Sequence, residues 1–162
     1  MSSLQSVVVL DNIRSLYNVG SIIRTADAFG IGEVFVCGYT PSPKDARLWK
    51  RQQSDPDAMI KKTALKGLQT VKWSQEETAE TAVRKLKEAG YFCVAVEQHP
   101  SSIPASKRFQ APIAIVIGNE LDGVSPETLK LCDQIIEIPM RGAGKSLNVA
   151  IAFGIVCHSL LG

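Results

Sequence analysis

Short runs of apolar, often β-branched residues alternate along the chain with stretches in which apolar positions recur at helical spacing. The apolar runs predict strands at Val7–Leu10, Glu33–Cys37, Tyr91–Val96, Ile113–Ile117 and Ile135–Ile138. Polar residues do not alternate with apolar ones inside these runs. This pattern is typical of strands in a parallel sheet that is covered on both faces.

The stretches between and after these runs predict five helices. They are expected at Val19–Phe29, within Asp57–Leu68, and at Gln75–Ala89, Pro126–Leu131 and Leu147–Leu161. Because strands and helices alternate, we expect one α/β domain over residues 1–162, with a parallel sheet between two helical layers and right-handed crossovers.

Local signals mark several boundaries of these elements. Ser74 and Glu77 form a capping-box pattern that predicts the start of the third helix, and Gly90 ends it. Two proline-containing stretches, Tyr39–Pro56 and His99–Pro112, predict long surface loops. Loops of that length in a compact domain are usually functional or mobile.

Composition and charge narrow the class of protein. The 162 residues are 45% hydrophobic and 21% charged, which is typical of a globular protein. No apolar run reaches the ~20 residues that cross a bilayer, and Met1–Leu10 reads as a first strand and not as a signal peptide. We therefore expect a cytoplasmic protein without a membrane partner.

The cysteines and histidines do not form a metal-binding pattern. Cys37, Cys93, Cys132 and Cys157 lie far apart without a C-x-x-C pair, and no histidine lies near a cysteine cluster. We expect buried, reduced thiols and no metal site.

The net charge of +2 permits a nucleic-acid partner without requiring one, since a local basic patch matters more than the total. Basic residues crowd one segment: Lys44, Arg47, Lys50, Arg51, Lys61, Lys62 and Lys66. Charge alone favours a solvated loop and helix face there over an RNA contact.

Three segments of the C-terminal third pass directly from a predicted strand to glycine and polar residues. These segments are Ile117–Ser125, Ile136–Met140 and Arg141–Ala150. Ligands of open parallel sheets bind beyond the carboxyl ends of the strands. Gly118 and Gly123 would allow a ligand close to the backbone or a positive φ, and together the segments suit a flat nucleoside.

Two other nucleotide-binding motifs fail on inspection. Gly144-Lys145-Ser146 resembles the end of a phosphate-binding loop, but that motif requires glycine where the chain has Pro139. The first predicted strand is followed by Asp11–Gly20, which contains no G-x-G-x-x-G, and this argues against a dinucleotide-binding fold.

Several polar residues at these edges have a structural and a functional interpretation. Glu120 is either an ordinary acid, at the surface or capping a helix, or a group at the mouth of the crevice. Ser146 and Asn148 could cap the final helix, contact a ligand, or do both. Arg24 is either a solvated helical arginine or one of a patch of donors suited to phosphate, with Asn12, Arg14 and Asn18.

The final helix, Leu147–Leu161, is apolar almost all round and must be buried on most sides. Burial within the core of one domain and burial at a subunit interface are both compatible with this pattern.

The ordered motifs resemble those of the SpoU/TrmH family of RNA methyltransferases in the SPOUT superfamily, over residues 6–160. They are Asn12-x5-Asn18-x-Gly20-x3-Arg24-Thr25-Ala26, Gly118-Asn119-Glu120-x2-Gly123-Val124, Ile138-Pro139-Met140 and Ser146-Leu147-Asn148-Val149-Ala150. The resemblance implies a C-terminal deep trefoil knot, an obligate homodimer and S-adenosylmethionine as cofactor. It implies cofactor contacts at Val96, Gly118, Ile138, Met140, Ser146 and Leu147.

The resemblance also implies roles for polar residues in methyl transfer to a ribose 2′-hydroxyl. It places Arg24, Asn18, Glu120, Ser146 and Asn148 in the active site, and Asn12, Arg14 and Arg24 at the RNA. Because the guanidinium pKa lies above ~12, Arg24 is expected to organise the 2′-hydroxyl and its adjacent phosphate, not to act as the base.

The expected substrate is transfer RNA, with ribosomal RNA as the alternative. The retention of Arg24, Glu120 and Asn148 favours an enzyme over a catalytically silent RNA-binding homologue. The family often carries an extra N-terminal RNA-binding domain that has no counterpart in these residues, so the dimer surface is expected to recognise the RNA.

Overall fold

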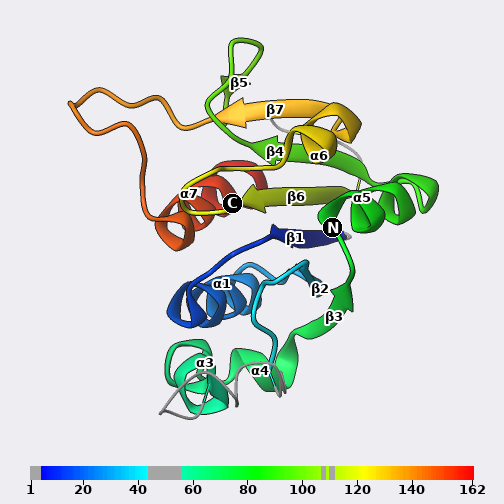
Figure 1. The fold of residues 1–162 in the computed structure, drawn as a ribbon, viewed down its shortest axis with the longest axis vertical. Coiled ribbons are helices and arrows are strands. Elements are labelled where there is room, and N and C mark those ends of the chain that lie inside the picture. The colour runs from blue at the N-terminus through cyan, green and yellow to red at the C-terminus, as the bar shows by residue number, and fades with distance from the viewer. Residues whose placement is uncertain (1–4, 44–55, 107–108, 110–111) are drawn as a thin grey trace.

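The computed structural model describes residues 5–43, 56–106, 109 and 112–162, and these form one sheet of seven parallel strands. The strand order is β3-β2-β1-β6-β4-β7-β5 (Figure 1). The strands are β1 (Ser6–Asp11), β2 (Glu33–Cys37), β3 (Lys72–Glu76), β4 (Phe92–Val96), β5 (Ile103–Pro104), β6 (Ile113–Gly118) and β7 (Gln134–Glu137). The predicted parallel α/β fold is confirmed, and β3 and β5 are strands that the sequence pattern did not indicate.

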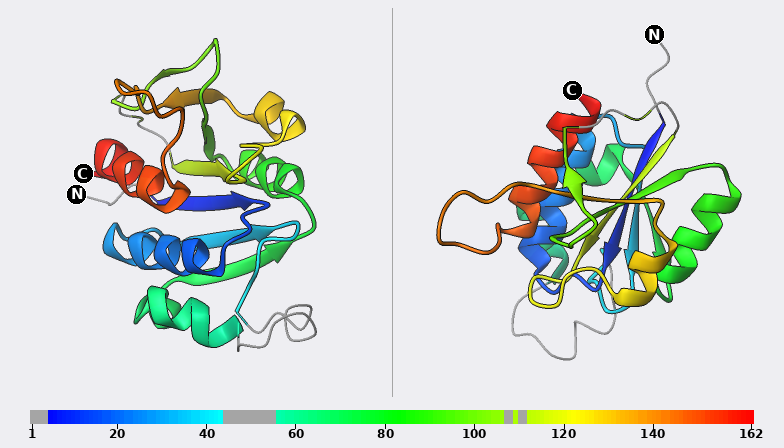
Figure 2. Two further views of the ribbon diagram at one scale, coloured as in Figure 1. Left: turned by 60° about the vertical axis from the view of Figure 1, so that its left-hand side comes forward. Right: turned by 90° about the horizontal axis from the view of Figure 1, so that it is seen from above.

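Helices cover both faces of this sheet (Figure 2). On one face α1 (Leu16–Ala28) packs against α3 (Pro56–Ala64), α4 (Gly67–Thr70) and α7 (Val149–Leu161). On the other face α5 (Ala79–Glu88) packs against α6 (Pro126–Leu131). The predicted helices are all present, with boundaries shifted by a few residues.

The continuous apolar runs are explained by burial on both sides of the sheet. Val8 and Leu10 of β1 belong to the cluster that faces α1 and α7, whereas Val7 and Val9 belong to the cluster that faces α5. All four are almost fully buried. Since successive strand residues point to opposite faces, a strand covered on both sides has no position for a polar side chain.

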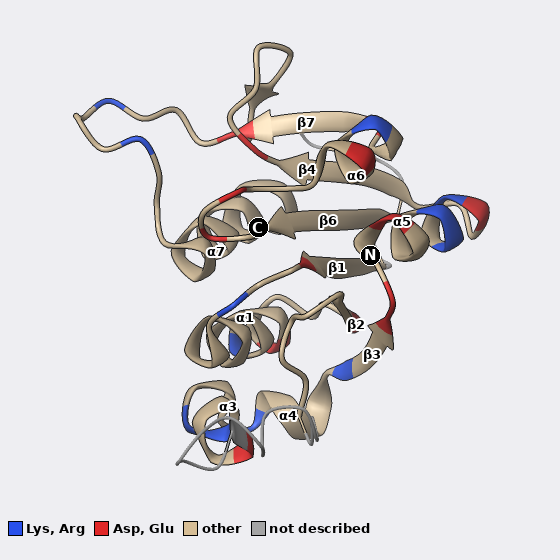
Figure 3. Ribbon diagram, in the orientation of Figure 1, with Lys and Arg blue, Asp and Glu red and all other residues tan. Residues whose placement is uncertain are grey.

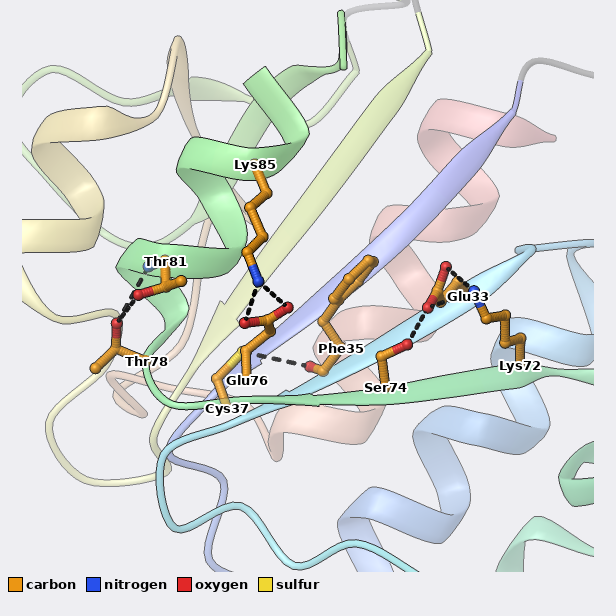
Figure 4. A network of polar contacts seen from close by, with 9 residues as sticks. All are labelled: Glu33, Phe35, Cys37, Lys72, Ser74, Glu76, Thr78, Thr81 and Lys85. Carbon is orange, nitrogen blue, oxygen red and sulfur yellow. Dashed lines mark hydrogen bonds and ion pairs between the residues drawn. The ribbon is translucent and has the colours of Figure 1, made fainter. Parts of the chain in front are cut away.

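The predicted capping box at Ser74 is wrong. Ser74 lies inside β3, which pairs with β2, and its hydroxyl donates to the carboxylate of Glu33 (Figure 4). Helix α5 begins later, after Thr78, whose hydroxyl oxygen accepts a hydrogen bond of 3.1 Å from the backbone N–H of Thr81. Pairing with a neighbouring strand satisfies the backbone of Lys72–Glu76 and overrides the local helix signal.

The segment Tyr39–Pro56 is only partly a surface loop. Residues 44–55 lie outside the described residues, and residues 40–43 are buried. The hydroxyl of Thr40 accepts a hydrogen bond from the N–H of Ile13 and donates one to the carbonyl of Leu10. These bonds anchor the start of the segment beneath the end of β1. The second predicted loop, His99–Pro112, contains the short edge strand β5, which pairs with β7.

The cysteines are free thiols, as predicted, and Cys132 is half-buried while the other three are buried. Helix α7 buries Phe153 and Val156 in the core but leaves Ile151 57% and Ile155 40% exposed. Core burial therefore accounts for one side of this apolar helix only. No helix in the described part of the chain has the length and apolar character to span a membrane.

Candidate active site

Two adjoining hollows lie at the carboxyl ends of β4, β6 and β7. Their volumes are about 330 Å3 and about 150 Å3. The two hollows share six lining residues: Val96, Glu97, Lys145, Ser146, Leu147 and Ala152. We treat them as one groove, which we call the strand-end groove. The residues predicted to hold a cofactor all line it: Val96, Gly118, Ile138, Met140, Ser146 and Leu147.

A tight loop after β6 forms one wall of the strand-end groove. Asn119 and Gly123 exchange two backbone hydrogen bonds of 2.9 Å. Gly123 has φ +72°, so a positive φ, one of the two roles predicted for this glycine, is confirmed. A Cβ on Gly118 would lie 2.1 Å from the backbone of Gly123 and Val124. Gly118 is therefore required for packing of the chain on itself, a reason that the sequence did not distinguish from ligand contact.

Glu120 leaves this loop and binds the start of α1. Its carboxylate accepts hydrogen bonds from the N–H of Arg14 at 2.9 Å, the N–H of Ser15 at 3.1 Å and the side-chain amide of Asn18 at 2.8 Å. Burial acts to raise the pKa of the Glu120 carboxyl, but these hydrogen bonds outweigh it and hold the pKa below its ordinary value. Glu120 is thus ionised and fixes the two residues that lead into α1, together with the Asn18 side chain in its first turn, across more than a hundred positions of sequence.

The network continues from Asn18 to the last helix. The side-chain amide of Asn148 donates a hydrogen bond of 3.1 Å to Oδ1 of Asn18. Oδ1 of Asn148 accepts bonds of 2.9 and 3.4 Å from the N–H groups of Ala150 and Ile151, so Asn148 caps α7. Its capping role is confirmed, and Ser146 lies beside it in the wall of the groove. Glu120, Asn18 and Asn148 join three distant segments at one point.

Asn12 belongs to a second hydrogen-bonded group at the same edge of the sheet. It has φ +57°, its Oδ1 accepts from the N–H of Tyr39 at 3.1 Å, and its carbonyl accepts from the side-chain amide of Asn119 at 2.8 Å. The same amide of Asn119 donates to the hydroxyl of Tyr39 at 2.8 Å. Asn12 therefore shapes the rim beside Glu120 through contacts inside the chain.

The predicted patch of donors is divided in the structure. The backbone of Arg14 binds Glu120 and its side chain is exposed, so Arg14 lies at the rim of the groove. Arg24 lies six positions beyond Asn18 on α1, which corresponds to about 9 Å along the helix and a rotation of about 240°. It lines a separate hollow with Lys66 and Gly67. Within one chain, Arg24 and the Glu120 network face different parts of the surface.

Sequence reasoning missed Glu97, which lines both parts of the strand-end groove. Its carboxylate accepts hydrogen bonds from the N–H of Val124 at 3.1 Å and of Gln98 at 2.9 Å, and so ties the loop after β6 to the end of β4. Glu137 lines the smaller part, and Lys145 lines both. The available signal was position: Glu97 is the first charged residue after a buried strand.

The fold is an α/β domain with a groove beyond the carboxyl ends of its parallel strands, which is where open parallel sheets bind ligands. A family model, the SpoU rRNA Methylase family, matches residues 5–158. The chain belongs to this family.

Two curated relatives and one solved structure illustrate the range of its similarities. A 23S rRNA (guanosine-2′-O-)-methyltransferase RlmB from Vibrio parahaemolyticus is 31% identical over 92% of the chain and 56% of the relative. A tRNA (guanosine(18)-2′-O)-methyltransferase from Aquifex aeolicus is 32% identical over 94% of the chain and 66% of the relative. The crystal structure of an AdoMet-bound rRNA methyltransferase from Sinorhizobium meliloti matches with a TM-score of 0.83 and 27% identity, over 96% of this chain and 55% of that one.

The chain spans about half to two thirds of the lengths of these proteins. The shared part covers nearly all of this chain.

Proposed function

We propose that this protein transfers a methyl group from S-adenosylmethionine to a ribose 2′-hydroxyl of RNA. The observation that carries the proposal is the strand-end groove, where the residues matching the family's cofactor positions lie together beside the Glu120–Asn18–Asn148 network. The curated relatives, which are named as RNA 2′-O-methyltransferases, support the same activity.

The groove has the chemistry that this cofactor requires. Val96, Ile138 and Leu147 supply apolar walls for a flat base. Glu97 and Glu137 supply carboxylates in the same groove, which suit a ligand that carries a sulfonium and an ammonium group. These residues would hold S-adenosylmethionine. When bound, it supplies an electrophilic methyl group on a positively charged sulfur.

The protein's own contribution is to position the ribose and to help its hydroxyl lose a proton. Glu120 is ionised with both oxygens occupied by hydrogen bonds, so we assign it to positioning and not to proton abstraction. It orients Asn18, which in turn binds Asn148, the residue between Leu147 and Val149 in the wall of the groove. Arg24 is assigned to the 2′-hydroxyl and its adjacent phosphate, with the proton passing to that phosphate or to water.

We further propose that the active protein is a homodimer with the family's trefoil knot. The exposed Ile151 and Ile155 of α7 support an apolar interface. Because Arg24 and the groove lie apart in one chain, the Arg24 that acts at one groove would come from the second copy. Sedimentation at micromolar concentration tests this proposal, and a monomer would contradict it.

Transfer RNA is the substrate we propose. The tRNA-modifying relative supports it, and the relative that acts on 23S rRNA makes ribosomal RNA the alternative. The test is calorimetric titration with S-adenosylmethionine, followed by mass spectrometry of nucleosides from transfer RNA and ribosomal RNA incubated separately. Cofactor binding with a ribose-methylated nucleoside is expected. Absence of cofactor binding would contradict the proposed enzyme activity. Cofactor binding without methyl transfer to either RNA would favour a catalytically silent homologue.

A mixing experiment tests the origin of Arg24. Arg24→Ala removes the arginine, and Leu147→Trp fills the groove, in which Leu147 lines both parts. Each variant alone should be inactive, and Arg24→Ala should still bind cofactor. If Arg24 acts across the dimer, mixed dimers regain one intact site, or about a quarter of normal activity for random exchange. If Arg24 acts within its own chain, mixing restores nothing.

A further inference from the structure

Three basic residues line two hollows along α1, α3 and α4, away from the strand-end groove, and a fourth follows one of them in the sequence. Arg24 and Lys66 line one hollow of about 440 Å3, and Lys61 lines another of about 480 Å3. Lys62 lies beside Lys61, and all four side chains are exposed. The basic segments of α3 and of the turn before α4 lie next to each other in Figure 3. We call this region the α3–α4 surface.

The cations of the α3–α4 surface lack the partners that cations have on the opposite face. None of the four forms an ion pair with a residue that the structure describes. The basic residues of α5 are paired at 2.6–2.8 Å, as Arg84–Glu80, Lys85–Glu76 and Lys87–Asp133. Two acids line the same hollows, Asp57 with Lys61 and Asp27 with Arg24, and the hydroxyl of Thr70 donates a hydrogen bond to Asp27. The four cations outnumber these two acids, so the α3–α4 surface keeps a net positive charge that favours an anionic partner.

Leu65 lies at the centre of this surface in an unfavourable conformation. It has φ +51°, its side chain is 54% exposed, and it lines both hollows. Glycine or asparagine is the usual residue for a left-handed position just after a helix, and strain of this kind is found at sites of function. An exposed leucine among cations provides an apolar contact inside a charged surface.

We propose that the α3–α4 surface binds the sugar–phosphate backbone of the RNA substrate, with Leu65 against a sugar or base. This inference rests on the proposed function. Helix α1 supports it, because this helix places Arg24 at the α3–α4 surface. In the proposed dimer Arg24 acts at the groove of the second copy, so RNA bound to the α3–α4 surface would lie next to that groove. The dipole of α3 favours Lys61 and Lys62 at its carboxyl end. It accounts neither for Lys66 and Arg24 nor for the strained Leu65.

The test replaces three lysines in the full chain by glutamine: Lys61→Gln, Lys62→Gln and Lys66→Gln. Binding of transfer RNA is measured by fluorescence anisotropy over a series of salt concentrations. Since each phosphate contact contributes about 0.9 to the slope of log affinity against log salt, the triple variant should lose about 2 to 3 from that slope. The matched control, Arg84→Gln with Lys85→Gln and Lys87→Gln, removes the same charge from the other face and should keep the slope. Equal losses in both triple variants, or no loss in the first, would overturn the proposal.

A single substitution tests the apolar contact separately. Leu65→Asn suits the left-handed backbone, so thermal stability should be kept or raised while RNA affinity falls several-fold with an unchanged salt slope. Unchanged RNA affinity would remove Leu65 from the interface. Titration with S-adenosylmethionine separates the two levels of the proposal. If the triple variant binds both cofactor and RNA normally, only the proposed role of the α3–α4 surface is contradicted. If the unaltered protein binds no RNA, the proposed function is contradicted as well.

Discussion

The side-chain amide of Asn18 donates a hydrogen bond of 2.8 Å to Oε1 of Glu120, across 102 positions of sequence. This bond joins the first helix to the loop after β6, and Asn148 extends the contact to the last helix. Three of the residues that we propose for the active site thus also hold the chain together beside the strand-end groove. Substitutions there must be examined for stability and for activity separately.

The stabilisation by Glu120 should depend on pH. The folded-state pKa of Glu120 is lowered, so its contribution is present above the ordinary value of 4.5 and is lost as pH falls through the lowered pKa. Glu120→Gln should cost about 1–3 kcal/mol near neutral pH, because one carboxylate acceptor for the N–H groups of Arg14 and Ser15 is lost. Urea unfolding of both proteins should show this difference shrinking in acid. A difference that is constant with pH would mean that the charge of Glu120 does not stabilise the fold.

The two functions of Asn148 can be separated by two substitutions. Asn148→Ala removes both the cap of α7 and the bond to Asn18, so unfolding free energy should fall by about 1 kcal/mol and methyl transfer should fall sharply. Asn148→Ser keeps an acceptor for the helix but removes the amide donor, so stability should be nearly normal while transfer still falls. Normal transfer by the serine variant would show that the contact with Asn18 has no catalytic importance.

Gly123 should tolerate no side chain. A Cβ there would lie 2.0 Å from Oε2 of Glu97, at φ +72°. Gly123→Ala should cost about 1–3 kcal/mol in unfolding free energy and weaken cofactor binding, because the loop wall must move. Gly142→Ala is the matched control, since nothing lies within 4 Å of its added Cβ, and it should change stability by less than about 0.5 kcal/mol. Adding Glu97→Ala to Gly123→Ala should recover part of the lost unfolding free energy, because it removes the carboxylate that the new Cβ would meet. No recovery would contradict the steric explanation.

The thiols should react slowly in the folded protein. Burial raises the pKa of Cys93 to about 11 and the pKa values of Cys132 and Cys157 to about 12, so little thiolate exists near neutral pH. Burial also raises the pKa of Cys37. Iodoacetamide labelling followed by mass spectrometry should show slow modification, with half-buried Cys132 first, and rapid modification in urea. A thiol that reacts equally fast in both conditions would contradict its placement.

Much of the fold was readable from local pattern. Continuous apolar runs such as Val7–Leu10 predicted strands covered on both faces, because both sides of β1 are buried. The capping position of Asn148 was also readable, since a cap contacts residues only two or three positions away. Lys72–Glu76 was not readable as a strand: among the described strands it pairs with β2 alone, and the local signal at Ser74 favoured a helix.

The sequence by itself determined the alternation of strands and helices, because buried strands are continuous apolar runs. Through its resemblance to the family it also indicated the cofactor positions that line the strand-end groove. Only the tertiary structure decided which contacts each polar residue makes. It bound Glu120 to the backbone just before α1, and it placed Arg24 on another face of that helix. The physical reason is that a hydrogen bond between residues more than a hundred positions apart depends on strand order and helix rotation, which no local pattern encodes.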